Sequence, residues 1–191
     1  MKPILFWDTE TTGLPLWKEP SEHPDQPHLV ELAAMLVNPE TRELIAFMDV
    51  IIKPDGWIIP DEAAAVHGIT TERALAEGIP EAEALDMFLA LYEQCGIRCA
   101  HNTTFDNRII RIAMKRYKPE AVPEEQWKDK ASYHCTMVEH SKKHGGKWPT
   151  LGEAFKFHFG REFENGHRAM IDTKGCMEIY FAALDAEKAA A

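Results

Sequence analysis

The stretch that decides the fold is Ile4–Leu14, "ILFWDTETTGL". It opens with four apolar residues, as a buried strand should, but Asp8 and Glu10 follow where a core strand would stay apolar. Residues i and i+2 of a strand point to the same face, so the two carboxylates lie side by side. Such a pair repels itself unless a proton or a cation lies between the groups. This predicts a cation site at the strand end, and the alternative is a solvent-exposed strand end followed by a Thr-Thr-Gly turn.

Further apolar runs predict the other strands of the sheet, and they lie at 29–37, 44–52, 97–101 and, more weakly, 132–137. The turn-forming segment "NPETRE" separates the first two of these, which indicates an antiparallel hairpin. Helical periodicity is found in four segments: 81–94, 105–117, 151–159 and 169–184. Strands come first, and strand and helix then alternate. This order predicts an α/β fold, a mixed five-stranded sheet flanked by helices in one domain over residues 1–191.

Composition narrows the class of protein. The chain has 191 residues, 45% of them hydrophobic, and a formal net charge of -10. This charge argues against a protein that binds nucleic acid mainly by neutralising phosphates, but less against an enzyme that recruits cations into a carboxylate cluster. Two segments lack periodicity: the proline-rich loop insertion 14–28 and the alanine-rich C-terminus 186–191, which we expect to fray.

The cysteines and the N-terminal residues indicate in which cellular compartment the protein is expected. The four cysteines form no CxxC pair, and the first apolar stretch is too short for a signal peptide. No run approaches the roughly 20 apolar residues that a membrane span needs. We therefore expect a reduced, cytoplasmic protein without a membrane contact.

Two later segments carry further polar side chains. In "AHNTTFDNRII", 100–110, a strand ends at Asn102 and a helix begins near Thr104, which places Asp106 in the first turn, where the helix dipole already favours an acid. In "GHRAMIDTKG", 166–175, one continuous helix would separate His167 from Asp172 by roughly 140°. If His167 instead lies on the loop before the helix, both side chains can reach one pocket. The alternative is a helix start with an exposed histidine.

Taken in order, these segments resemble the three motifs of the DEDDh-type 3′→5′ exonucleases, a group that includes the proofreading subunit of bacterial DNA polymerase III. The first motif matches "DTETTGL", the second "HNTTFD" and the third His-x4-Asp. The resemblance covers most of residues 3–187, including "KPDGWIIPDEAAAVHGIT", and implies a ribonuclease H-like fold. The 14–28 loop is longer than we expect of the family.

The resemblance implies a metal-dependent exonuclease that hydrolyses phosphodiester bonds at 3′ ends of single-stranded nucleic acid, with DNA favoured over RNA, and releases nucleoside 5′-monophosphates. Carboxylates select hard cations, so two Mg²⁺ or Mn²⁺ ions are the expected cofactors of a two-metal mechanism. The implied catalytic residues are the four metal ligands and a general base: Asp8, Glu10, Asp106, Asp172 and His167. The implied substrate-binding residues are Thr9, Thr11, Gly13, Leu14, His67, Asn102 and Phe105.

Several alternatives stay open at this point. An RNA-trimming exoribonuclease would carry the same acids, and a non-catalytic polymerase-associated module would keep the same fold. A polymerase or another replication protein is an expected partner, as in proofreading. Phe105 is either a plain core residue or a surface on which bases stack, and Trp17 either extends that surface or has no role. The other histidines are assigned no role.

Overall fold

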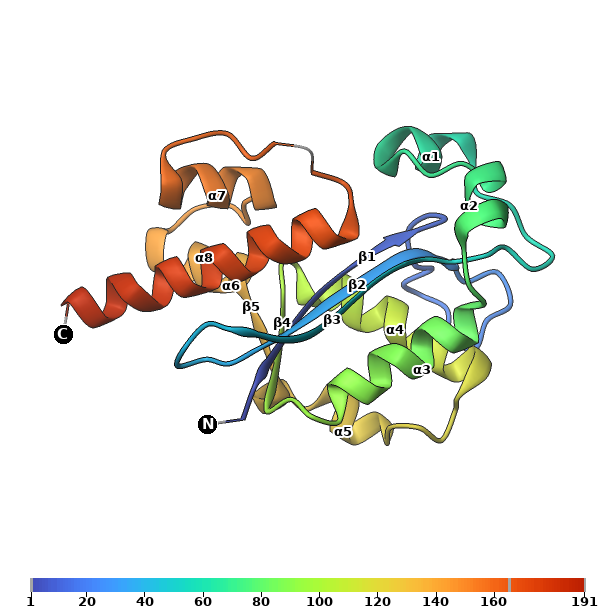
Figure 1. The fold of residues 1–191 in the computed structure, drawn as a ribbon, viewed down its shortest axis with the longest axis horizontal. Coiled ribbons are helices and arrows are strands. Elements are labelled where there is room, and N and C mark those ends of the chain that lie inside the picture. Colours follow the sequence, from blue (N-terminus) through green and yellow to red (C-terminus); the bar gives the residue numbers. More distant parts are fainter. Residues whose placement is uncertain (1, 165, 191) are drawn as a thin grey trace.

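The computed structural model describes residues 2–164 and 166–190, and its five strands form one mixed sheet (Figure 1). The strands are β1 (Ile4–Thr11), β2 (Leu29–Val37), β3 (Leu44–Ile51), β4 (Ile97–Ala100) and β5 (Tyr133–Cys135). Their order is β3-β2-β1-β4-β5, with β1 antiparallel to β2 and parallel to β4. β2 and β3 form the predicted antiparallel hairpin. The predicted single α/β domain with a mixed five-stranded sheet is confirmed.

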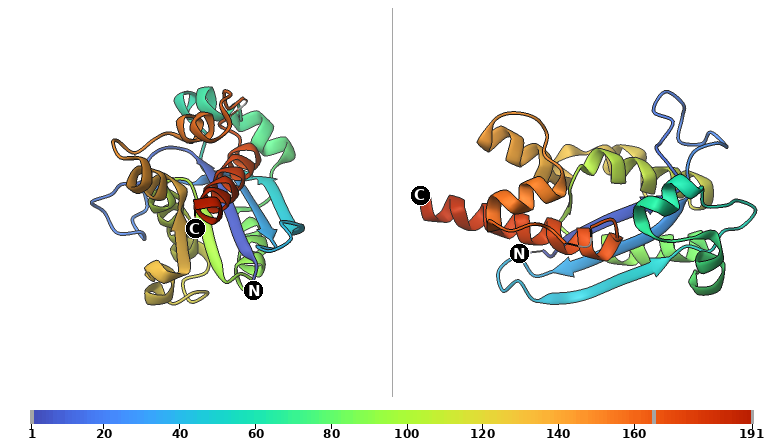
Figure 2. Two further views of the ribbon diagram at one scale, coloured as in Figure 1. Left: turned by 90° about the vertical axis from the view of Figure 1, so that its left-hand side faces the viewer. Right: turned by 90° about the horizontal axis from the view of Figure 1, so that it is seen from above.

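Helices cover both faces of this sheet (Figures 1 and 2). They are α1 (Asp61–His67), α2 (Thr71–Glu77), α3 (Glu81–Tyr92), α4 (Thr103–Tyr117), α5 (Glu124–Lys128), α6 (Thr136–His144), α7 (Leu151–Phe159) and α8 (Ala169–Ala190). α3 and α4 share the larger core with the sheet, whereas α8 packs on the opposite face and carries α7 on its outer side. The result is a layered arrangement in which β1 lies at the centre.

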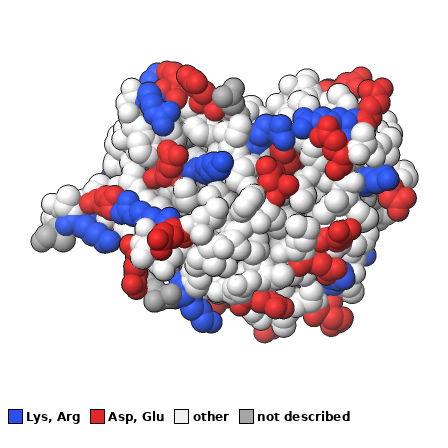
Figure 3. Space-filling view, in the orientation of Figure 1, with Lys and Arg blue, Asp and Glu red and all other residues white. Residues whose placement is uncertain are grey.

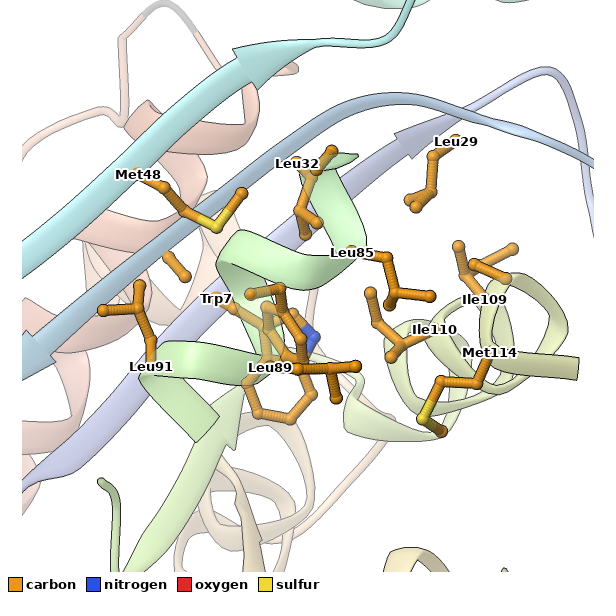
Figure 4. Close-up of a cluster of buried hydrophobic side chains, with 14 of the residues drawn as sticks. Trp7, Leu29, Leu32, Met48, Leu85, Leu89, Leu91, Ile109, Ile110 and Met114 are labelled. Carbon is orange, nitrogen blue, oxygen red and sulfur yellow. The ribbon is translucent and has the colours of Figure 1, made fainter. Parts of the chain in front are cut away.

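Alternation along β1 decides which side chains meet which layer. Leu5 and Trp7 lie in the core shared with α3 and α4, and Figure 4 shows Trp7 beside these two helices. Ile4 and Phe6 point the other way, into the core shared with α8. Fully burying a large apolar side chain stabilises a fold by about 1.5–3 kcal/mol, so four such residues fix the register of the strand. The same alternation then directs Asp8 toward α8.

The structure differs from the sequence-based expectation mainly in short elements. The four predicted helices are present, but α1, α2, α5 and α6 were not predicted. The predicted strand at 132–137 is wrong in its second half, because β5 ends at Cys135 and α6 begins at Thr136. Neither glycine nor proline marks this boundary, and no side-chain hydrogen bond caps the helix. A strand therefore passes into a helix without a signal in the sequence.

The C-terminal helix is longer than its periodicity indicated. α8 runs to Ala190, beyond the predicted end at residue 184, and residue 191 lies outside the described residues. Fraying over 186–191 stays a prediction. None of the helices in the described part of the chain, α8 included, is both long and apolar enough to cross a membrane.

The proline-rich loop 14–28 is fastened to the domain by side-chain hydrogen bonds. The buried Gln26 accepts from the backbone N–H of Leu16 at 3.0 Å and donates to its carbonyl at 3.1 Å. Arg108 of α4 donates to Ser21 Oγ at 3.0 Å. The loop therefore holds one shape beside the carboxyl end of β1, although it has no regular secondary structure.

Candidate active site

Three of the four predicted acids meet between β1 and α8. Asp8 and Glu10 follow one another on the α8 face of β1, and Asp172 lies in the first turn of α8. One carboxylate oxygen from each of the three lies within 4.8 Å of the others. His167 lies on the loop before α8, as the pocket hypothesis required, and its backbone N–H donates to Asp172 Oδ2 at 3.0 Å.

The fourth acid, Asp106, reaches the same place from the other face of the sheet. β4 pairs with β1 as far as Phe6 and ends at Ala100, and the chain then turns into α4. Asp106, in the first turn of α4, is only 2% exposed and accepts a hydrogen bond from Thr9 Oγ1 at 2.8 Å. Asp106 thus occupies a helix N-terminus, and its charge also acts on Asp8, while its role as a metal ligand stays a prediction.

The four carboxylates repel one another in a poorly solvated site. Burial, followed by the charges of its acidic neighbours, raises the pKa of Asp8 well above its usual range. Burial is also the main cause that raises the pKa of Glu10 to about 8 and that of Asp106 to about 7, and it raises the pKa of Asp172. Asp172 Oδ1 is buried and has no hydrogen-bond partner among the described residues. Arg168 offsets the charge of Glu10 only in part, and a cluster of carboxylate oxygens of this kind fits hard divalent cations such as Mg²⁺ or Mn²⁺.

The metal-free protein is expected to lose stability as the pH rises. The pKa values of these carboxyl groups are about 4 in an unfolded chain and higher in the folded chain, so their contribution to stability is complete below pH 4. It is lost as the pH passes about 7 for Asp106 and about 8 for Glu10. Mn²⁺ should offset this loss. Adding Mn²⁺ should therefore raise the Tm more at pH 8 than at pH 5, by a difference of several degrees. Thermal unfolding with chelator and with Mn²⁺ measures this, and equal gains at both pH values would contradict it.

A groove opens beside the carboxylates, between the end of β1 and α1. The predicted substrate-binding residues that line it are Thr9, Thr11, Gly13, Leu14, His67 and Phe105. In the space-filling view, the outline of the molecule is indented between α7 and α1 (Figure 3). Asn102 is not among the lining residues; it is exposed and holds a left-handed conformation, with φ of 64°, at the start of α4.

Two of the lining residues differ in how they are held. Phe105 packs against the main core and also lines the groove, so the core and substrate hypotheses do not exclude each other. Leu14, in contrast, is 76% exposed at the start of the proline-rich loop. Phe105 is thus held in place by the core, whereas Leu14 presents an apolar side chain to solvent.

The ring of His67 lines this groove and is almost fully buried. The backbone N–H of Ile69 donates to His67 Nδ1 at 3.2 Å, which leaves the proton of the neutral ring on Nε2. Nε2 is buried and makes no well-formed hydrogen bond in the described part of the chain, although the ring interacts with the Thr11 backbone. Burial lowers the pKa of His67, which favours the neutral ring. A buried donor without a well-formed hydrogen bond is an exception in folded proteins, and a ligand bound in the groove is one explanation for it.

The sequence analysis missed a pair that holds α8 in place. Glu31 of β2 lies directly opposite Glu10 and is 1% exposed. Arg168 donates through Nε to both carboxylate oxygens of Glu31, at 3.0 and 3.1 Å, and the backbone N–H of Ala169 donates to Oε2 at 2.8 Å. Glu31 therefore fixes the start of the helix that carries Asp172. A lone acid in the otherwise apolar run "LVELAAMLV" was the signal that could have revealed it.

Replacing Arg168 by alanine is expected to destabilise the fold by at least roughly 2 kcal/mol. Removing one partner of a fully buried ion pair costs about 3–5 kcal/mol, and Arg168 keeps some contact with solvent. The matched control is Arg42→Ala, which breaks an exposed pair with Asp185 and should have a much smaller effect. Urea unfolding of both variants checks this prediction, and equal losses of stability would contradict the role of Arg168.

Solved structures share this fold. The chain superposes on a structure of exonuclease I solved to explain how processivity is achieved, with a TM-score of 0.71 and 23% identity over 95% of this chain and 40% of that chain. For E. coli exonuclease I in complex with a dT13 oligonucleotide, the TM-score is 0.70 and the identity 24%, over 96% of this chain and 41% of that chain. At these identities the likeness shows the fold. The chain spans about two fifths of the length of these proteins.

Comparison with models of protein families shows to which family the chain belongs. Among curated proteins, no match to the sequence was found. A model of the RNase_T exonuclease family, however, matches residues 5–180, which include all four acids and His167. The expected membership of the DEDDh-type 3′→5′ exonucleases agrees with this match and with the fold. The chain belongs to the exonuclease family.

Proposed function

We propose that this chain hydrolyses single-stranded DNA from its 3′ end and releases nucleoside 5′-monophosphates, with two Mg²⁺ or Mn²⁺ ions as cofactors. The proposal rests mainly on one observation: Glu10 belongs both to the carboxylate cluster and to the lining of the groove, so the two sites adjoin. A terminal nucleotide in the groove would place its phosphate beside the acids. Exonuclease I, which shares the fold, has been solved with a single-stranded oligonucleotide.

The acids would hold the cations in distinct roles. Asp8 lies within reach of Glu10 and Asp172 and also interacts with Asp106, which suits a ligand shared by two ions. Glu10 and Asp172 would complete one site, and Asp106 would serve the other, through water. When bound, the cations would neutralise charge on the attacking and leaving oxygens of the phosphodiester. The residues themselves fix the positions of the ligands, because they lie on strands and helices rather than on loops.

His167 would remove the proton from the attacking water. Its side chain is exposed at the mouth of the site, and an imidazole is the side chain that can accept a proton near neutral pH. The residue has a φ of 68°, which is uncommon for a residue other than glycine. The hydrogen bond from its backbone to Asp172 holds this conformation. Strain of this kind is often kept at functional positions.

The groove would hold the terminal nucleotide by one hydrogen bond and by stacking. His67 would donate through Nε2, and Phe105 and Leu14 would contact the last bases in a way that tolerates any sequence. Thr9 would orient Asp106, and Thr11 Oγ1 would hold the turn by its 2.7 Å bond to the Gly13 carbonyl. Asn102 would contact the strand from the start of α4. On the face drawn in Figure 3, basic and acidic side chains are interspersed, which supports a single strand over a duplex.

The finer points of the proposal concern its biological setting. DNA is favoured over RNA, a polymerase or another replication protein is the expected partner, and proofreading is the expected context. All four cysteines are free thiols, which agrees with the expected cytoplasmic location.

One assay tests the function directly. Single-stranded DNA and RNA of the same sequence, labelled at the 5′ end, are incubated with Mg²⁺, Mn²⁺ or chelator, and the products are sized over time. We expect a ladder of shortening DNA with either metal and none with chelator. Faster shortening of RNA would favour the exoribonuclease, and metal-dependent binding without cleavage would favour the non-catalytic module. Cutting of a closed circular strand would refute an exonuclease.

A further inference from the structure

Three histidines form a second cluster of possible metal ligands, separate from the carboxylates. His140 and His144 lie on α6, and His158 lies on α7. One ring nitrogen from each lies within 4.8 Å of the others. None of the three belongs to the acid cluster or lines the groove. We refer to them as the imidazole cluster.

The local structure explains why these rings meet. His140 and His144 are four residues apart, so they lie on one face of α6, with ring centroids 4.7 Å apart. α7 begins at a capping box made by Thr150 and Glu153 and packs against α6. This packing brings the ring of His158 to 5.7 Å from His140 and 6.2 Å from His144.

The cluster has an unsatisfied polar atom and an open side. His140 Nδ1 is buried and has no hydrogen-bond partner among the described residues. A buried ring nitrogen of this kind is costly unless a partner satisfies it. His144, in contrast, is exposed, so an ion has a path from solvent to the rings. Burial lowers the pKa of His140 and of His158, which favours the neutral form that binds metals.

We propose that the imidazole cluster binds one Zn²⁺ ion, with water in the fourth position. Three imidazoles without a carboxylate select a borderline transition metal rather than Mg²⁺ or Mn²⁺. Tetrahedral bonds of about 2.1 Å require nitrogens about 3.4 Å apart, so modest rotations of the rings close the site. The alternative is that the rings merely pack around Phe157, whose ring lies 4.8 Å from His140 and 4.2 Å from His144.

The ion would clamp α6 to α7. In Figure 1 both helices lie beside α8, and α7 packs against α8 through Phe155 and Ile179. The loop that follows α7 leads to His167, so the clamp would stabilise the part of the domain that carries the third motif. The site therefore contributes to stability and is not part of the catalytic centre.

Zn²⁺ affinity of the metal-free chain, measured by competition with a chromophoric chelator, tests the site. Every protein in this test carries Asp8→Ala, which weakens Zn²⁺ binding at the carboxylate site. The variants made in this parent are His144→Ala and His158→Ala. His144 is exposed, so its replacement is compatible with folding, and circular dichroism checks both variants. The matched control is His23→Ala in the proline-rich loop. Co²⁺ serves as a second probe, because tetrahedral imidazole ligation gives strong visible absorption and octahedral carboxylate ligation does not.

We expect one Zn²⁺ per chain, a Tm that rises with Zn²⁺, and tetrahedral Co²⁺ bands. His144→Ala and His158→Ala should each weaken Zn²⁺ binding by at least about 10-fold. Replacing a residue that merely hydrogen-bonds to a metal ligand already costs about 10-fold or more in metal affinity, and these variants lose a ligand itself. His23→Ala should bind Zn²⁺ as tightly as the parent. Equal affinity in all the variants, or Co²⁺ spectra without tetrahedral bands, would overturn the proposal and leave the rings as packing partners of Phe157.

Discussion

Replacing Asp8 by alanine is expected to reduce turnover by at least about 10³-fold. Asp8 is the acid assigned to both cations, and a cation supplies several kcal/mol of charge stabilisation in the transition state. Mn²⁺ affinity should fall together with turnover, because the variant loses a ligand and not merely a proton acceptor. Single-turnover cleavage of 5′-labelled single-stranded DNA and calorimetric titration with Mn²⁺ measure the two effects.

The stability of the Asp8 variant separates loss of a ligand from loss of the fold. Burial and then the charges of acidic neighbours raise the pKa of Asp8, so removing its carboxyl group relieves both the cost of burying a charge and the repulsion. In chelator at pH 8, Asp8→Ala should therefore unfold at the same temperature as the parent or a higher one. Asp8→Asn, which keeps the shape, should behave alike, and the exposed Asp86→Ala should leave cleavage unchanged. A variant that kept Mn²⁺ affinity and turnover would remove Asp8 from the metal site.

Replacing His167 by alanine is expected to slow the chemical step by about 10²–10⁴-fold, the usual contribution of a general base. Every carboxylate oxygen stays in place, so Mn²⁺ affinity and binding of a 3′ end should change little. The residual rate should rise with pH, because hydroxide takes over the role of the missing base. Single-turnover cleavage from pH 6 to 10, with Mn²⁺ affinity followed in parallel, separates proton transfer from metal binding.

A second variant keeps this test independent of backbone geometry. His167 holds a left-handed conformation and donates its N–H to Asp172, so alanine strains a position that asparagine tolerates better. His167→Asn should lose as much activity as His167→Ala, whereas His23→Ala should lose none. Near-normal cleavage at pH 7 in either His167 variant, or a loss of Mn²⁺ affinity as large as that of Asp8→Ala, would show that His167 is not the base.

The predicted site depended on patterns that are local in the sequence. Asp8 and Glu10 share a face because side chains alternate along a strand. His167 lies on the loop just before α8, close to Asp172 in the first turn of that helix. Their chemistry requires fixed residue types at fixed spacing, so their order along the chain was informative. The tertiary fold brought them together as this order implied, with Asp106 arriving from the opposite face of the sheet.

The ion pair and the imidazole cluster could not be found in the same way. Glu31 and Arg168 are far apart in the chain, and each alone looks like an ordinary charged residue. His158 lies one helix away from His144, and α6 itself was not predicted because its start carries no cap. Contacts of this kind arise from packing between elements, and the periodicity of one segment says nothing about its neighbour.

By itself, the sequence determined the strand that carries Asp8 and Glu10, the mixed sheet, the exonuclease family and the residues that we assign to catalysis. Each of these follows from alternation, helical periodicity or motif spacing, which act over a few residues. Only the tertiary structure decided that the ring of His67 is buried beside the groove, that Glu31 anchors α8, and that three histidines meet between α6 and α7. These features depend on which faces of distant elements are buried together, and burial is a property of the whole fold.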